Sequence, residues 1–173
     1  MAAVHLGWEP MTRLLPHPDR PDPLATVRLA DATRTTVAPG SYDAVRYRHS
    51  SRFPFSGVAL PLDLRGELAD AARTDVLSPR PLERPPQLAV LATAQDRRTD
   101  WLRAGQALER VLLLATASGV QASLLHQAVE WADCAASDSA AARRARPQMV
   151  IRLGYGPGSS LSPLHGADRV WSP

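Results

Sequence analysis

One stretch of the chain, DWLRAGQALERVLLLATASG (residues 100–119), limits the possible folds more than any other. Its apolar residues recur at the three- and four-residue spacing of an α-helix that buries one face. The predicted apolar face consists of Trp101, Leu108, Val111, Leu112 and Ala115. We expect the helix to begin at Asp96 or Thr99 and to end at Gly119, because glycine readily adopts the left-handed conformation that closes a helix. Such a helix needs an apolar surface to pack against.

Two short apolar runs on either side of this helix supply that surface. QLAVLATA (residues 87–94) and PQMVIRLGYG (residues 147–156) are continuous enough in apolar character to predict buried strands. Earlier in the chain, LDLRGELADAART (residues 62–74) has helical spacing, and Ser41 is placed to cap a helix over residues 42–51. The order helix, helix, strand, helix, strand predicts a mixed α+β layered domain.

The two ends of the chain have different patterns. We expect residues 1–9 to be the end of a helix, and residues 11–15 and 24–30 to be two short strands joined by a proline-rich connection. Residues 121–128 read as an extended segment that crosses the domain. Residues 159–173 have no periodicity and are rich in serine and proline, which predicts an extended or disordered tail.

Composition excludes several classes of function. The hydrophobic content of 45% and the charged content of 21% are those of a soluble globular protein. All 20 basic residues are arginine, so the chain has no Walker-A lysine, no Schiff-base lysine and no Ser-Lys dyad. The single cysteine, Cys134, excludes an intramolecular disulfide, and neither a signal peptide nor a membrane-spanning run is evident. We therefore expect a soluble cytoplasmic protein with no membrane or nucleic-acid partner.

Two patterns resemble ligand sites but are incomplete. His126, Glu130 and Cys134 are spaced four residues apart, as metal ligands on one helix face would be, yet no second cluster completes a tetrahedral site. A solvated helix face explains the same spacing. GYGPGSS (residues 154–160) has the glycine spacing of a dinucleotide-binding loop, but the sequence after it does not predict the helix that such a loop requires. There is also no G-x-S-x-G motif of a serine hydrolase.

RHSSRFPF (residues 48–55) is the most informative polar stretch. Arg48, Ser50 and Arg52 lie within five residues at the end of a predicted helix, and arginine and serine donors suit a phosphate group. From the residues alone, two interpretations stay open: an anion-binding corner, or a polar helix end followed by a hydrophobic anchor.

These segments together resemble a known family. RYRHSSRFPF (residues 46–55) resembles the Arg-Arg-x-Ser-x-Arg signature that opens an FMN-dependent nitroreductase domain. PPQLAVLAT (residues 85–93), residues 100–130 and RPQMVIRLGYGP (residues 146–157) resemble, in the same order, the second lobe of Acg-type nitroreductase-like flavoproteins, in which two such lobes are fused. The leader (residues 3–29) resembles the close of their first lobe.

The resemblance implies a domain organisation and a fold. Residues 1–40 would be the end of a first lobe plus a linker, residues 41–158 a nitroreductase-like lobe, and residues 159–173 a tail. The implied fold is an α+β sandwich with long central interface helices, incomplete relative to the family. Relatives also carry a complete first lobe, a lid insertion and a terminal basic pair. At the position of that basic pair, this chain has Leu164 and His165.

The resemblance also implies a cofactor, FMN, and the residues that bind it. Arg48 and Ser50 would hold its phosphate and ribityl chain, Arg52 would face the N1/O2 side of the flavin ring, and the segment after residue 124 would pass its N5. The implied cofactor-binding residues are Arg48, His49, Ser50, Arg52, Leu125, His126 and Gln127.

The implied activity is NAD(P)H-dependent reduction of nitro-aromatic or quinone-type acceptors by ping-pong flavin chemistry, or storage of flavin. The chain would form a homodimer through the helix of residues 99–118, or pair with a related lobe. Two alternatives remain: a non-catalytic truncated remnant that acts as an interaction or dimerisation module, and an arginine-rich nucleic-acid binder.

Overall fold

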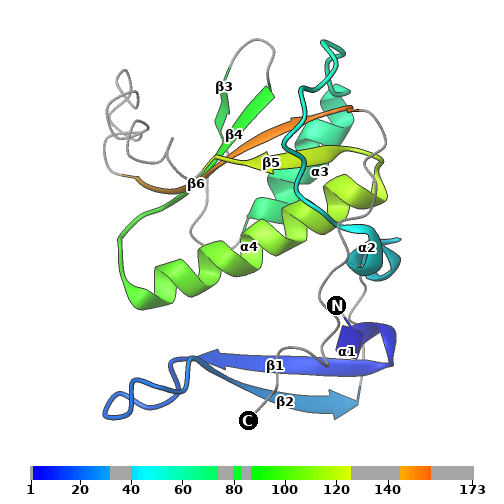
Figure 1. The fold of residues 1–173 in the computed structure, drawn as a ribbon. Coiled ribbons are helices and arrows are strands. Elements are labelled where there is room, and N and C mark those ends of the chain that lie inside the picture. The colour runs from blue at the N-terminus through cyan, green and yellow to red at the C-terminus, as the bar shows by residue number, and fades with distance from the viewer. Residues whose placement is uncertain (1, 32–39, 74–79, 83–86, 126–144, 157–173) are drawn as a thin grey trace.

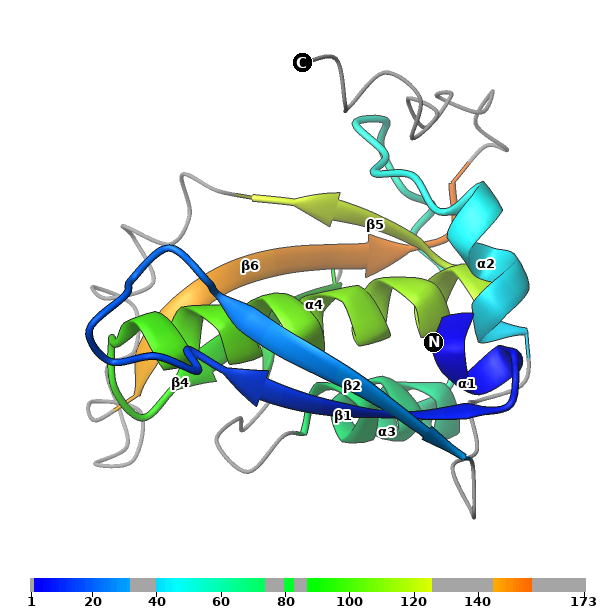
Figure 2. The same cartoon turned by 90° about the horizontal axis from the view of Figure 1, so that it is seen from below.

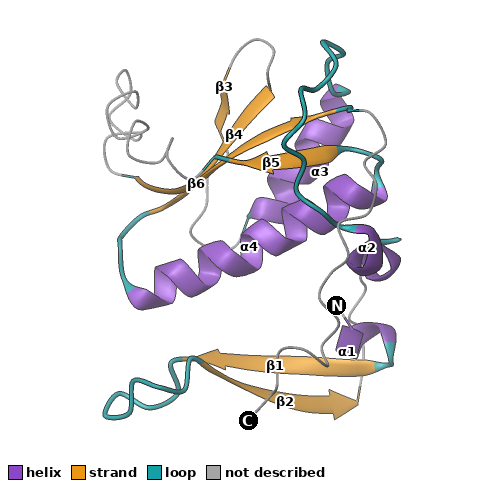
Figure 3. Cartoon of the chain, viewed as in Figure 1, coloured by secondary structure: helices purple, strands orange, loops and turns teal. Residues whose placement is uncertain are grey.

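A computed structural model describes most of the chain, in five ranges. These are residues 2–31, 40–73, 80–82, 87–125 and 145–156. In chain order the elements are α1 (Ala2–His5), β1 (Trp8–Leu14), β2 (Ala25–Asp31), α2 (Ser41–Tyr47), α3 (Leu62–Ala72), β3 (Arg80–Leu82), β4 (Gln87–Thr93), α4 (Arg98–Ala117), β5 (Gln121–Leu124) and β6 (Arg146–Gly154) (Figure 1). The helices and strands form a mixed α+β fold, as the sequence predicts (Figure 3).

The main sheet has four antiparallel strands in the order β3-β4-β6-β5. The two predicted apolar strands, β4 and β6, are its centre, and the three-residue β3 was not predicted because it lies in a proline-rich connection. The β4–β6 register shifts at Leu91/Ala92, where Leu91 pairs with Met149 and Ala92 with Pro147. Gln148 is therefore the extra residue of a β-bulge, which turns its side chain toward the start of α4.

Helices α3 and α4 pack against each other and cover one face of this sheet (Figures 1 and 2). The apolar spacing of both helices predicts this face, and the core lies between them and the strands. The core residues are Leu60, Leu68, Ala72, Leu91, Val111, Leu112, Ala115, Val120, Ala122, Met149, Ile151 and Leu153. Arg110 on α4 donates from Nε to the Ala71 carbonyl at 3.2 Å, and its partial burial lowers its pKa.

The long helix α4 runs from Arg98 to Ala117. At its start the Asp100 carboxylate accepts a hydrogen bond from the Arg97 backbone amide at 3.1 Å, and at its end Gly119 has a φ of 72°. Both ends lie close to the predicted positions. None of the described helices has the length and apolar character that crossing a bilayer requires.

One residue assigned to the apolar face of α4 is placed wrongly by the sequence analysis. The Trp101 side chain is not in the core; the residue is 52% exposed and its Nε1 donates to the Asp96 carboxylate. Gln148 donates to the same carboxylate oxygen at 3.3 Å, and these two hydrogen bonds lower the pKa of Asp96. Trp101 follows the helical spacing, but the residues that the start of α4 buries are Asp100 and Ala104.

The N-terminal residues form a hairpin beside this domain. β1 and β2 pair antiparallel from Trp8↔Asp31 to Leu14↔Ala25, which confirms the two predicted strands. The hairpin lies on the side of α4 away from the sheet: Figure 1 shows it beneath α4, and Figure 2 shows it crossing in front. The Arg98 guanidinium donates to the Pro21 carbonyl at 2.7 Å and links the two parts.

The predicted helix over residues 1–9 is longer than the helix that the structure shows. The helix α1 ends at His5, Gly7 turns the chain with a φ of 82°, and β1 begins at Trp8. Pro10 does not stop a helix but lies inside β1, which proline tolerates because a two-stranded ribbon has only edge strands. The predicted tail, residues 159–173, lies outside the described residues.

Candidate functional site

The stretch of residues 48–53 leaves α2 and runs beside β5. Ser50 forms a parallel β-bridge with Ala122, and the Ser51 backbone amide donates to the Ala122 carbonyl at 2.8 Å. Ser51 is only 2% exposed, and its hydroxyl accepts a hydrogen bond from the Phe53 amide at 3.3 Å. The backbone of the stretch is therefore fixed against the edge strand of the main sheet.

The start and end of α2 differ from the prediction. Gly40, with a φ of 74°, is the N-cap of α2, whereas Ser41 is the first residue of the helix and is buried. The helix ends at Tyr47, and Arg48 follows in an extended conformation with its amide bonded to the Ala44 carbonyl at 2.8 Å. The earlier end leaves the polar residues after position 47 outside the helix.

Arg48 makes an ion pair with the long helix. Its Nε lies 3.4 Å from Oε1 of Glu109 on α4, and the two side chains are 23% and 51% exposed. This pair crosses from the candidate site to α4 and partly neutralises Arg48. Glu109 was not predictable as the partner of Arg48, because the two residues lie 61 positions apart in the chain.

Arg52 and Ser50 are both exposed. Among the described residues, the Arg52 guanidinium has no hydrogen-bonding or ion-pair partner. His49 is directed back toward α2, since its Nδ1 donates to the Tyr47 carbonyl at 2.9 Å. The corner thus presents one uncompensated cation, one exposed hydroxyl and one cation shared with Glu109.

The second part of the predicted site begins at the other end of β5. Leu125 follows the strand directly, is partly buried, and donates from its amide to the Val150 carbonyl at 2.9 Å. Leu125 lies three positions after Ala122, the partner of Ser50, which corresponds to about 10 Å along a strand. The two predicted parts therefore flank the same strand, while His126 and Gln127 lie outside the described residues.

Arg152 on β6 contacts the segment that follows this corner, and the sequence did not predict that role. Its guanidinium lies 4.5 Å from the centroid of the Phe55 ring, and Nη2 donates to the Phe53 carbonyl at 2.9 Å. Its Nε is buried without a hydrogen-bonding partner among the described residues. Arg152 therefore anchors the Phe-Pro-Phe segment. The feature of the sequence that could have indicated this role is its position in a predicted strand, shortly before two glycines.

The glycines after Arg152 are needed for close packing. A Cβ on Gly154 would lie 2.8 Å from Phe55, and a Cβ on Gly156 would lie 2.5 Å from the Gln121 side-chain oxygen. The Ser56 amide also donates to the Tyr155 carbonyl at 2.6 Å. These contacts explain the G-x-G spacing by the approach of Phe55 and Gln121 rather than by a phosphate-binding loop.

The spacing that resembles a metal site stays a prediction. His126, Glu130 and Cys134 all lie outside the described residues. Within the described part of the chain, no group of three potential metal ligands comes together.

Comparisons with known proteins support the fold. No family model and no curated protein matches the sequence. Among solved structures, a Bacteroides thetaiotaomicron protein assigned as an NADH dehydrogenase/NAD(P)H nitroreductase is similar with a TM-score of 0.64 and 11% identity, over 79% of this chain and 98% of that one.

Two further structures show the same likeness. A nitroreductase-like family protein from Bacillus cereus has a TM-score of 0.62 and 13% identity, over 81% of this chain and 98% of its own. A nitroreductase with bound FMN from Desulfitobacterium hafniense has a TM-score of 0.60 and 10% identity, over 79% of this chain and 100% of its own. The chain therefore has a nitroreductase-like fold, which confirms the predicted fold class.

Proposed function

We propose that this chain is an FMN-binding nitroreductase-like flavoprotein, which uses NAD(P)H to reduce nitro-aromatic or quinone-type acceptors or else stores flavin. The observation that carries the proposal is the position of residues 48–52 in a nitroreductase-like fold. Ser51 fixes this segment against β5 and leaves Ser50 and Arg52 exposed. The corner lies beside β5, the strand that Leu125 follows, and the second half of the predicted site starts at Leu125.

The donors of this corner fit a phosphate group. The phosphate of FMN carries close to two negative charges, and Arg48 and Arg52 supply two cations while Ser50 supplies a hydroxyl donor. Arg48 is paired through Nε alone, so its two terminal nitrogens are available for a bidentate contact. FMN, when bound, supplies a ring that accepts and donates hydride. Arg52 would stabilise negative charge that develops beside it.

A second copy of the chain is the proposed partner, or a related lobe in its place. The hairpin carries exposed apolar side chains, among them Met11, Val27 and Leu29, and a two-stranded ribbon is at best marginally stable alone. Trp101 lies exposed on α4, the helix that the hairpin crosses. A partner packed on the hairpin and the outer side of α4 would bury these side chains.

The alternative is a non-catalytic interaction module with the same fold. One observation favours it: Glu109 already compensates Arg48, which weakens the corner as an anion site. The two proposals differ in flavin binding, since the module would form the same dimer without a flavin.

The test is FMN binding by the purified chain, followed by flavin absorbance and by a titration that yields Kd. Arg52→Ala should weaken FMN binding about tenfold to a hundredfold, because it removes charge-assisted hydrogen bonds. Arg73→Ala is the matched control, since Arg73 is an exposed arginine that pairs with Asp70 on α3. A flavin absorbance spectrum that the chain does not change in a titration up to millimolar FMN, or an Arg52→Ala variant with unchanged Kd, would refute the flavin proposal.

A further inference from the structure

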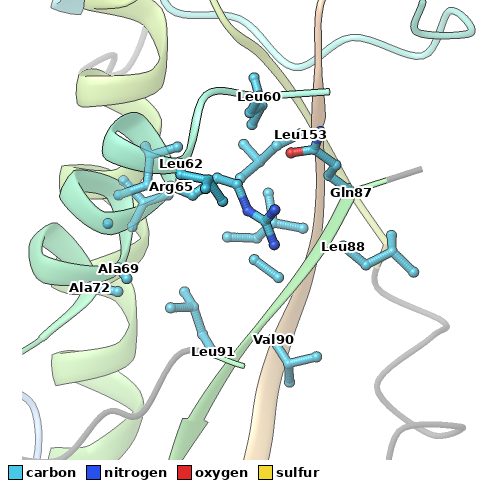
Figure 4. Close-up of a pocket in the computed structure, with 15 residues that line it drawn as sticks. Leu60, Leu62, Arg65, Ala69, Ala72, Gln87, Leu88, Val90, Leu91 and Leu153 are labelled. Carbon is cyan, nitrogen blue, oxygen red and sulfur yellow. The ribbon is translucent and has the colours of Figure 1, made fainter. Parts of the chain in front are cut away.

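A cavity of about 280 Å³ lies between α3 and the main sheet. Its walls are mostly apolar and come from the loop before α3, from α3, β4 and β6, and from Val111 on α4. Leu60, Leu91 and Leu153 surround its centre in Figure 4. Leu62, which is 80% exposed, also lines it. Its volume is near the lower end of the range for small-molecule sites, about 300–1,000 Å³.

The sequence of α3 explains why the space is open. Gly66, Ala69 and Ala72 recur every three residues along α3, and all three line the cavity. A Cβ on Gly66 would meet no atom within 4 Å. Larger side chains at this spacing would fill the space between helix and strand, so the small residues keep it open.

Two polar groups interrupt the apolar walls. Arg65 extends from α3 toward β4, with its guanidinium between the two elements in Figure 4. This guanidinium is partly buried, and no side-chain hydrogen bond or ion pair joins it to any described residue. The side-chain oxygen of Gln87 on β4 is buried and has no donor among the described residues.

These two groups set opposite requirements for a ligand. The Arg65 guanidinium has only donors and carries one charge, so it matches a carboxylate, which accepts two parallel hydrogen bonds from it. Gln87 lines the cavity and its side-chain oxygen is a buried acceptor, so that oxygen needs a hydroxyl or an N–H donor. The leucine and valine walls require an apolar body between them.

We propose that this cavity is a binding site for a small aromatic monocarboxylate that carries a hydroxyl group. The carboxylate binds Arg65, the hydroxyl donates to Gln87, and the ring packs against the leucines of α3, β4 and β6. The site is separate from the flavin corner, because neither β5 nor residues 48–52 line it. β6 lies between β5 and β4 in the sheet.

The test compares three probes by isothermal titration on the full chain: 4-hydroxyphenylacetate, phenylacetate and methyl 4-hydroxyphenylacetate. The hydroxy acid should bind most tightly, because it alone satisfies both Arg65 and Gln87. Phenylacetate leaves the buried Gln87 oxygen without a donor, and the methyl ester leaves the partly buried Arg65 without a carboxylate, so each should bind more weakly. Saturating hydroxy acid should also raise the Tm of the chain.

Two variants on α3 test the location. Arg65→Gln should weaken binding of the hydroxy acid about tenfold to a hundredfold. Arg73→Gln, which changes an exposed arginine directly after the same helix, should leave the affinity unchanged. Gly66 is exposed and lines the cavity, so Gly66→Leu should obstruct its open side and abolish binding without lowering Tm, because leucine is a better helix former than glycine. This variant keeps the charge of Arg65, so a loss of binding reports the cavity itself.

Several results would overturn the proposal. They are no binding of the hydroxy acid at millimolar concentration, equal affinity for its methyl ester or for phenylacetate, and unchanged affinity in Arg65→Gln or Gly66→Leu. A loss of binding in Arg52→Ala would place the carboxylate in the flavin corner and would equally overturn it.

Discussion

Glu109→Gln isolates the electrostatic role of the ion pair at the proposed flavin corner. The substitution keeps the size of the side chain and removes the charge that lies 3.4 Å from the Arg48 guanidinium. If Arg48 binds the phosphate of FMN, Glu109 competes with that phosphate for the same cation. The variant should therefore bind FMN more tightly than the parent chain does.

The structure sets the size of this gain. The two side chains are 23% and 51% exposed, so solvent screens the pair and its value is that of an exposed salt bridge, about 0.2–1 kcal/mol. Releasing Arg48 from this pair should lower Kd for FMN by about 1.4-fold to fivefold. The gain should shrink at high salt, because the lost competition is electrostatic.

The assay is quenching of FMN fluorescence on binding, measured at low and high salt in four proteins: parent, Glu109→Gln, Arg48→Ala and the double variant. In the Arg48→Ala background the second substitution should lose most of its effect, since the cation that Glu109 competes for is absent. Weaker FMN binding in Glu109→Gln would refute the reasoning. An equal gain with and without Arg48 would show that Glu109 acts on the ligand directly.

Two further predictions concern stability. Gly154→Ala should destabilise the chain by about 1–3 kcal/mol in chemical denaturation, because its Cβ would lie 2.8 Å from Phe55. The control is Gly105→Ala, which has open space at its Cβ and should be neutral or stabilising. Equal effects of the two substitutions would contradict the close packing at Gly154. The hydrogen bond from Trp101 lowers the pKa of Asp96 in the folded state, so its contribution is present above the unfolded pKa and is lost as pH falls through the lower folded pKa. Denaturation midpoints from pH 7 to pH 2 should fall less steeply for Asp96→Asn, and an identical pH profile would contradict the assignment.

The main sheet and the long helix were predictable because burial leaves a strong pattern in the sequence. β4 and β6 are continuous apolar runs, and α4 has helical spacing with a glycine at its end. The pattern fails where a residue satisfies the periodicity without being buried, as Trp101 does. It also fails where a proline lies inside an edge strand, as Pro10 does in β1.

The candidate site was predictable only in part, because its polar contacts join distant segments. Arg48, Ser50 and Arg52 are adjacent in sequence and formed a recognisable cluster. Glu109 reaches this corner from α4, Arg152 reaches the segment after it from β6, and only the packing of those elements brings them there. No local pattern encodes such a pairing, so the competing charge at Arg48 and the anchor of Phe55 required the structure.

The helix α4 links the three proposed features of this chain. Glu109 on its outer side adjusts the charge of the flavin corner, and Val111, two residues later, faces inward and forms part of the wall of the α3 cavity. Trp101, at its start, lies exposed on the same helix that the hairpin crosses. Because a packed helix moves as a rigid unit, a partner that docks on its outer side would act on Glu109 and Val111 together. The charge at the corner and the shape of the cavity would then depend on the same association.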